Sequence, residues 1–373
     1  MSKIMLISPK DNNFYNFRSE LILKLCELGY EVILVCPYGE KIDYFTNRGC
    51  RFVDVSMDRR GKSFFNDLKL VLVYKKLLEA ERPDIVLTYT SKPSIYGGFI
   101  CCLMGIPYIV NNAGLMETTG LFDKFMKLLY WLGWRKASCM MYQNTAERDV
   151  IQQLLGNKVH YRDIPGSGVN LKSFAFTPYP KNKDVITFNF VGRIVALKGI
   201  NEFLECAVRI KQEYHNVRFV IYGDYEDDFY KQQIQALVKK EIIEYGGVQM
   251  DMKAYIAAAH AVIHPSYYEG MTNVVLEHSA MGRPCIGSNI PGVKEGIDDG
   301  RTGFLFEAKD VDSMVRAVKK FVELPYEQKI RMGKAARKKM EREFDRDIVT
   351  RVYLKEIKNI MRVRQFGVHN IVR

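Results

Sequence analysis

The sequence lacks the residue patterns that usually hold a metal ion or a cofactor. It has eight cysteines and six histidines, but no CxxC pair, no HExxH motif and no cluster of histidine with cysteine. The DxD triplet at 345–347 falls in a terminal helical region, and we interpret it as surface. Scattered cysteines exclude a disulfide framework and favour a reduced, cytosolic chain. We therefore predict neither a metal site nor a cofactor.

The sequence also lacks a membrane-spanning segment and a leader. The opening MSKIMLIS passes from one lysine directly into a short strand pattern, unlike a signal peptide. Residues 93–116 carry no charge, which is long enough to suggest a span. A Gly-Ile-Pro step at 105–107 interrupts this run and paired asparagines at 111–112 end it. We predict a buried helix followed by a buried strand.

The formal net charge of +12 is concentrated near the carboxyl terminus. Residues 329–373 hold 14 lysines and arginines against 5 acidic residues. Such a segment suits anionic lipid headgroups, although a solvated helix face has the same composition. It has no nucleic-acid-binding module, so we expect no nucleic-acid partner. We expect a cytoplasmic protein, with a peripheral position on the inner face of the cell membrane as one alternative.

Short apolar runs alternate with segments of helical period, the pattern of a parallel sheet covered by helices. The candidate strands are 3–8, 31–36, 51–55, 84–90, 107–111 and 138–143, then 185–192, 217–223, 261–266, 283–288 and 303–307. We predict an α/β protein with two Rossmann-like domains, whose ligands collect at the carboxyl ends of the strands. The expected parts are a first domain (1–170), a linker (171–184), a second domain (185–345) and a carboxyl-terminal helix with a basic tail (346–373).

Two helical segments carry apolar stripes. The last helix, around 346–362, is predicted to turn Ile348, Val352 and Ile357 inward. Segment 120–137 has lysines and tryptophans around an apolar stripe, so it is either a buried bundle helix or a helix at a membrane interface. The residues of that second stripe are Leu121, Phe125, Leu128, Leu129 and Leu132.

The strongest functional signal is the segment HPSYYEGMTNVVLEHSAMGRPCI. A loop in it carries Glu269 and Gly270, and a helix begins at about Thr272. Thr272 or Asn273 can cap that helix, whose free backbone N–H groups form an anion site. Glu277 follows on the helix, eight residues after Glu269, and faces the same mouth. One carboxylate can bind the hydroxyls of a ribose and the other those of a sugar.

A second signal is FVGRIVALKG, residues 190–199. A strand delivers Gly192 and Arg193 to its carboxyl end, and Lys198-Gly199 follow at the start of a helix. Two cations at one sheet edge suit a diphosphate whose charge grows as it leaves.

Neighbouring residues have less specific interpretations. His264 ends a strand beside the Glu269 loop, and a hydrogen-bonded structural imidazole is favoured over a catalytic base. Tyr267 and Tyr268 either wall a sugar pocket or pack.

In these motifs the chain resembles the retaining family 4 glycosyltransferases of the GT-B fold, whose signature is a Glu-x7-Glu pair preceded by a Gly-Arg…Lys-Gly loop. The resemblance extends over nearly the whole chain. It is closest to bacterial enzymes that extend polyprenyl-diphosphate-linked sugars for capsule, O-antigen or glycan assembly. It implies two Rossmann-like domains with parallel sheets facing across a cleft, and a carboxyl-terminal helix that returns to the first domain.

The resemblance also implies an activity. A hexose or N-acetylhexosamine moves, without a metal ion, from a nucleotide-diphosphate sugar with UDP as the expected nucleotide. The acceptor is a lipid-linked sugar, and the anomeric configuration is retained. An anionic membrane surface, contacted through 120–137 and 329–373, is a further expected partner.

The resemblance assigns roles residue by residue. Arg193, Lys198 and Glu269 are the catalytic candidates, with the two cations on the diphosphate and Glu269 on the transferred sugar. Glu277 holds the ribose. The remaining donor-side residues are Gly270, Thr272, Asn273 and Val274, and the acceptor-side residues are Lys92, Asn112 and Gly114.

Two rival functions remain at this point. A GT-B-like UDP-sugar epimerase shares the two-domain cleft and converts the donor with no acceptor present. A non-catalytic nucleotide-sugar-binding protein binds the nucleotide and turns nothing over.

Overall fold

A computed structural model describes residues 2–57, 64–111 and 120–365. The chain divides into two compact units, residues 1–167 with 347–373 and residues 168–346. Each unit contains one parallel sheet, which confirms the predicted pair of Rossmann-like domains. Among the described residues, no helix combines the length and the apolar character that crossing a bilayer requires.

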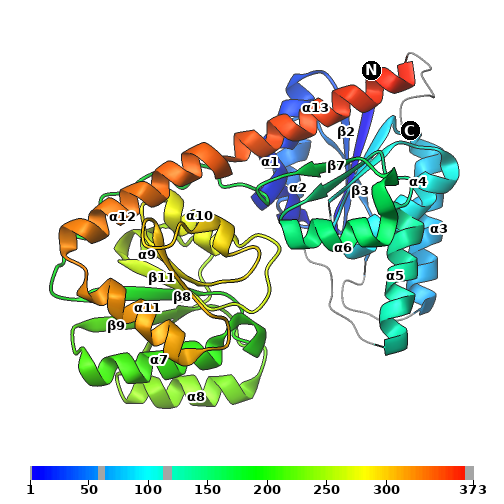
Figure 1. The fold of residues 1–373 in the computed structure, drawn as a ribbon. Coiled ribbons are helices and arrows are strands. Elements are labelled where there is room, and N and C mark those ends of the chain that lie inside the picture. Colours follow the sequence, from blue (N-terminus) through cyan, green and yellow to red (C-terminus); the bar gives the residue numbers. More distant parts are fainter. Residues whose placement is uncertain (1, 58–63, 112–119, 366–373) are drawn as a thin grey trace. The chain divides into compact units, whose positions relative to one another are not determined.

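The first unit is built on a seven-stranded sheet in the order β3-β2-β1-β4-β5-β6-β7 (Figure 1). Its strands are β1 (Lys3–Ile7), β2 (Glu31–Cys36), β3 (Arg51–Asp54), β4 (Ile85–Tyr89), β5 (Tyr108–Asn111), β6 (Cys139–Tyr142) and β7 (Tyr161–Asp163). Its helices are α1 (Asp11–Glu27), α2 (Ile42–Thr46), α3 (Phe64–Glu81), the π-helix η1 (Pro93–Gly97), α4 (Gly98–Met104), α5 (Gly120–Trp134), α6 (Thr145–Leu155) and α13 (Arg346–Gln365).

Both faces of this sheet are buried. Successive side chains of β1 point to opposite faces, so Ile4 and Leu6 join one core cluster while Met5 and Ile7 join the other. Helices α1, α2 and α13 cover the first cluster, and α3, α4, α5 and α6 cover the second. Burial on both faces requires nearly continuous apolar strands, which is why the sequence located them.

Helix α13 completes the first unit, as the predicted return of the carboxyl-terminal helix required. Ile357 points inward as predicted, but Ile348 and Val352 are only half-buried. The buried stripe is offset by one residue and consists of Val349, Tyr353, Ile357 and Met361. The helix also buries Glu356, whose Oε1 accepts a hydrogen bond from Arg162 Nε at 2.6 Å and whose Oε2 lies 3.1 Å from His160 Nε2.

Helix α5 buries a different face from the apolar stripe that the sequence predicted. Tyr130 and Trp134 are buried against the sheet, whereas Phe125 and Leu128 are about half exposed, at 48% and 51%. Gly133 on this face allows α5 to approach η1 closely. A Cβ at that position would lie 2.6 Å from the carbonyl oxygen of Ile95.

The second unit contains a six-stranded sheet in the order β10-β9-β8-β11-β12-β13. Its strands are β8 (Ile186–Val191), β9 (Val217–Tyr222), β10 (Glu244–Gly247), β11 (Ala261–His264), β12 (Cys285–Ser288) and β13 (Gly303–Phe306). Its helices are α7 (Ile200–Glu213), α8 (Asp228–Lys239), α9 (Lys253–Ala258), α10 (Asn273–Ala280), α11 (Val311–Glu323) and α12 (Tyr326–Lys339).

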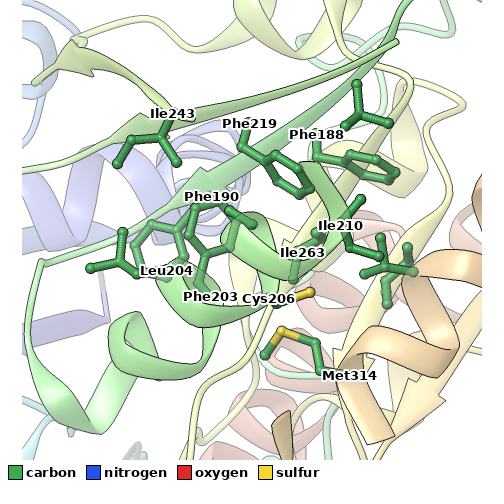
Figure 2. Close-up of a cluster of buried hydrophobic side chains, with 14 of the residues drawn as sticks. Phe188, Phe190, Phe203, Leu204, Cys206, Ile210, Phe219, Ile243, Ile263 and Met314 are labelled. Carbon is green, nitrogen blue, oxygen red and sulfur yellow. The ribbon is translucent and has the colours of Figure 1, made fainter. Parts of the chain in front are cut away.

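Phenylalanine rings pack against aliphatic side chains in the core of this unit (Figure 2). Phe188 is fully buried, with its ring 5.3 Å from that of Phe219 and 5.7 Å from that of Phe321. These contacts join two neighbouring strands to α11 and fix one face of the sheet.

The chain passes between the units twice, after residue 167 and after residue 346, and the two segments pair at the edge of the second unit. Val169 N donates to Phe344 O at 2.8 Å, and Arg346 N donates to Val169 O at 3.1 Å. The expected linker, residues 171–184, lies in this unit, where the Arg283 side chain donates to Thr177 and Tyr179 OH donates to His260 O.

We predict that Phe188→Ala lowers the free energy of unfolding by about 3–5 kcal/mol, because it opens a cavity in the core of the second unit. Phe229→Ala is the matched control, since Phe229 is 56% exposed on α8, and its cost is expected to be below about 1 kcal/mol. Urea unfolding followed by circular dichroism measures both. Equal losses in the two variants would contradict this account of the core.

Candidate active site

Two loops meet at the carboxyl edge of the second sheet, after the neighbouring strands β8 and β11. Leu197 O accepts hydrogen bonds from Tyr267 N at 3.0 Å and from Ser266 Oγ at 3.3 Å. Tyr267 OH also donates to Glu202 Oε1 at 2.6 Å, in the first turn of α7. This bond ties the Tyr267 loop to α7, and Glu202 is a residue that sequence reasoning missed.

Gly199 allows these loops to approach so closely. Its φ of +70° lies in the left-handed region, and a Cβ there would lie 2.1 Å from Pro265 O. Any other residue would push the two loops apart. The glycine therefore holds the preceding residue, Lys198, against the opposite loop.

Lys198 and Glu269 form an ion pair, with Lys198 Nζ 2.5 Å from Glu269 Oε1. The same oxygen lies 3.0 Å from His264 Nε2. Burial alone would raise the pKa of Glu269, but the hydrogen bond and charge of His264, together with Lys198, outweigh it and lower that pKa to about 2. Glu269 is thus a carboxylate at neutral pH, and its Oε2 has no hydrogen-bond partner among the described residues.

Arg193 also follows β8 at this edge, as predicted. Its guanidinium is about half exposed and lies 2.7 Å from Glu226 Oε1. Arg193 and Lys198 each hold a carboxylate, so both predicted diphosphate-binding cations are charge-paired in this structure.

Helix α10 begins beside the Glu269 loop with its amino end uncapped by a side chain. Thr272 occupies the N-cap position, but it makes no capping hydrogen bond, contrary to our expectation. The N–H groups of Asn273 and Val274 therefore lack this intramolecular partner. Thr272 N donates to Gly292 O at 3.0 Å, which fixes the start of the helix.

Glu277 lies one turn into α10, and its carboxylate makes no hydrogen bond with the described residues. Burial raises its pKa to about 7, and the charges of Arg346 and Lys253 only partly oppose this shift. The adjacent His278 is fully buried, donates through Nδ1 to Val274 O at 2.7 Å, and has its pKa lowered to about 3 by burial.

The acceptor-side candidates belong to the first unit. Lys92 is partly buried, and its Nζ lies 2.8 Å from Asp67 Oδ1. Tyr96 OH donates to the other oxygen of Asp67 at 2.8 Å. Asn112 and Gly114 lie outside the described residues.

The described residues contain one group with the composition of a metal site. The ligand atoms of Cys139, His160 and Glu356 lie within 4.8 Å of one another in the first unit. Glu356 is already paired with Arg162 and His160, and burial raises the pKa of Cys139 to about 12. Ion pairing that anchors α13 accounts for this arrangement.

Comparison with known families matches both parts of the chain. The family model described as "Glycosyl transferase 4-like" matches residues 3–144, and the one described as "Glycosyl transferases group 1" matches residues 172–339. The second match contains Arg193, Lys198, Glu269 and Glu277.

Individual relatives extend over most of the chain. A UDP-Gal:alpha-D-GlcNAc-diphosphoundecaprenol alpha-1,3-galactosyltransferase of Escherichia coli is 29% identical, over 78% of this chain and 79% of that protein. An N,N'-diacetylbacillosaminyl-diphospho-undecaprenol alpha-1,3-N-acetylgalactosaminyltransferase of Campylobacter jejuni is 23% identical, over 95% of this chain and 97% of that protein. The solved structure of Anabaena HepE in complex with UDP and glucose superposes with a TM-score of 0.77 at 14% identity, covering 96% of this chain and 100% of that one.

The two sheets, the site at the edge of the second and the matches to both parts lead to one conclusion: the chain belongs to the glycosyltransferases of GT-B fold, with a glycosyl transferase 4-like first part and a second part of glycosyl transferases group 1.

Proposed function

We propose that the protein is a retaining glycosyltransferase that moves a hexose or N-acetylhexosamine from a UDP-sugar to a polyprenyl-diphosphate-linked sugar acceptor in bacterial surface-glycan synthesis. One observation carries the proposal: Lys198 and His264 share Glu269 beside the uncapped start of α10. The names of the relatives, which include acceptors linked to diphosphoundecaprenol, support the choice of acceptor.

The proposed roles follow from charge. The diphosphate binds at the N–H groups of Asn273 and Val274, and Arg193 and Lys198 exchange a carboxylate partner for phosphate. Glu269, released from Lys198, then binds hydroxyls of the transferred sugar, and Glu277 binds the ribose.

Transfer requires no metal in this scheme. The acceptor hydroxyl forms a bond to the anomeric carbon on the face from which the diphosphate leaves. The bond between that carbon and the diphosphate oxygen breaks, and the acceptor proton passes to a phosphate oxygen. Arg193, Lys198 and the amino end of α10 stabilise the negative charge that grows on the leaving group.

The first unit has a surface that suits a lipid-linked acceptor. On α5, Phe125, Leu128 and Trp131 are exposed at positions three residues apart, beside the exposed Lys124 and Lys127. Apolar side chains flanked by cations are typical of a helix at a membrane interface. Of the two alternatives for 120–137, we therefore propose the interface, and with it a peripheral position on the inner membrane face.

In the second unit, basic side chains of α12 and its surroundings line a groove. They are Arg301, Arg331, Lys334, Lys338, Lys339 and Arg342, and the groove also contains Asp298, which is paired with Lys339. The groove supports the expected attraction of 329–373 to anionic lipid, since each cation near such a surface contributes about 1 kcal/mol.

We predict that purified protein releases UDP from one member of a UDP-sugar panel only when a polyprenyl-diphosphate-linked sugar is added. Lys198→Ala is expected to lower turnover by about 10²–10³-fold, since the leaving diphosphate loses a cation. Lys240→Ala, an exposed lysine at the end of α8, is the matched control and keeps full activity.

The same assay distinguishes the rival functions. Conversion of the donor alone, followed by NMR, would indicate an epimerase. Donor binding with no turnover would indicate a binding protein. Full activity of Lys198→Ala would remove the assigned role of Lys198.

We predict opposite effects of Glu277→Gln on stability and on donor binding. The folded-state pKa of about 7 exceeds the ordinary value of 4.5, so the fold loses stability as the pH rises from 4.5 to about 7, and the loss is complete above that pH. The variant should therefore have a higher Tm than wild type at pH 8 and the same Tm at pH 4.5. Its UDP affinity should fall about 10-fold or more, because the charged acceptor for the ribose is lost.

Differential scanning fluorimetry and calorimetric titration give the two readouts. Glu79→Gln, on the exposed face of α3, should show neither effect. A Tm difference for Glu277→Gln that does not change with pH would contradict the burial of its charge.

We predict that the protein sediments with vesicles of anionic phospholipid at low salt and is released as salt is raised. The double substitution Phe125→Glu with Trp131→Glu should abolish sedimentation, because it places charge on the apolar face of α5. Phe229→Glu, an exposed aromatic residue of the second unit, is the control. Failure of the wild type to sediment at low salt would exclude the membrane surface.

A further inference from the structure

We propose that His264 is a positioning residue, which holds Glu269 by Oε1 so that Oε2 is presented to the hydroxyls of the donor sugar. This inference rests on the proposed function and adds to it a residue that touches neither the nucleotide nor the sugar. Two kinds of observation carry it: the rigid setting of the imidazole and the unequal environment of the two carboxylate oxygens.

The imidazole is attached to one of the best-fixed backbone positions of the unit. His264 ends β11, which lies between β8 and β12 inside the sheet, and it is paired in register with Gly287. Its side chain is only 5% exposed. Glu269, in contrast, lies on a loop five residues later. A loop carboxylate keeps one orientation only if a rigid group holds it, and the imidazole is that group.

The two oxygens of Glu269 have different surroundings. Oε1 receives both Lys198 Nζ, at 2.5 Å, and His264 Nε2, at 3.0 Å. Oε2 has no hydrogen-bond partner among the described residues, although the side chain is 14% exposed. With Oε1 held from the protein side, Oε2 is the oxygen that remains for a hydroxyl group.

The importance of the imidazole increases when the donor binds. Lys198 has a long flexible side chain and is drawn toward the diphosphate, so its bond to Glu269 is the one that weakens. His264 cannot follow, because its backbone is part of the sheet. It then provides the remaining contact of Oε1 among the described residues, and the orientation of the sugar-binding carboxylate depends on it.

Nucleotide and nucleotide-sugar affinities separate this role from a general structural one. UDP lacks the transferred sugar and does not use Glu269 Oε2, so it binds equally well whichever way the carboxylate points. UDP-sugar uses both the nucleotide site and Glu269. A variant that only loosens the fold weakens both ligands together.

Three substitutions form a matched series. His264→Gln retains a donor, since the amide nitrogen of glutamine extends about as far as imidazole Nε2. His264→Asn carries the same amide but reaches only as far as Nδ1, and His264→Leu has no donor. Thermal unfolding establishes that each variant is folded. The comparison of Gln with Asn remains decisive even if the leucine variant does not fold.

Calorimetric titration with UDP, and with the UDP-sugar that supports transfer, provides the measurement. We expect His264→Asn and His264→Leu to bind UDP within about 2-fold of wild type and UDP-sugar about 10-fold or more weakly. His264→Gln should bind both ligands nearly as wild type does. In a Glu269→Gln background, His264→Asn should have little further effect, because both changes act through one carboxylate.

Two results would overturn the proposal. One is an equal loss of UDP and UDP-sugar affinity in a folded His264→Asn protein. The other is equal behaviour of the glutamine and asparagine variants. Wild-type protein that binds UDP-sugar no more tightly than UDP, and transfers no sugar, would instead remove the proposed function and the positioning role with it.

Discussion

One backbone oxygen holds the candidate site together: Leu197 O, which accepts hydrogen bonds from both Tyr267 N and Ser266 Oγ. These two bonds join the loop after β8 to the loop after β11, so that residues 71 positions apart in sequence become neighbours. This contact requires glycine at position 199, because no side chain fits between the loops. The position of Lys198 against Glu269 is thus set by how closely the two loops approach each other.

The two cations of the site are each paired with a carboxylate, and the proposed function replaces that carboxylate by a phosphate. Buried or half-buried cations are costly unless they are paired, and here Glu269 and Glu226 provide the pairing. In the proposed function, a diphosphate brings negative charge to the same edge of the sheet, where α10 offers N–H groups as well. Under that proposal, replacing carboxylate by phosphate keeps each cation neutralised throughout, and it sets the carboxylates free to face polar groups of a ligand.

The sequence predicted those parts of the structure that depend on continuous apolar runs. Strands buried on both faces were located, whereas β7 and β10 were missed, since Tyr161–Asp163 and Glu244–Gly247 are short edge strands without an apolar run. Shared placement of Lys198 and Glu269 at a sheet edge followed from their motifs. The ion pair between Lys198 and Glu269 could not be predicted, and neither could that between Arg193 and Glu226. Loop geometry selects such partners, and hydrophobic periodicity carries no information about loop geometry.

The order of synthesis differs from the order in which the two units become complete. The second unit is an insertion whose residues, 168–346, are all synthesised before the last core side chains of the first unit. Those late side chains are Val349, Tyr353, Ile357 and Met361, which join α1 and α2 in covering one face of a sheet whose strands were translated long before. At about 5–20 residues per second, that face waits for the last part of its cover for on the order of 10–40 s. The first unit to be translated is therefore the last to finish folding, and during this interval it presents an open apolar surface to chaperones.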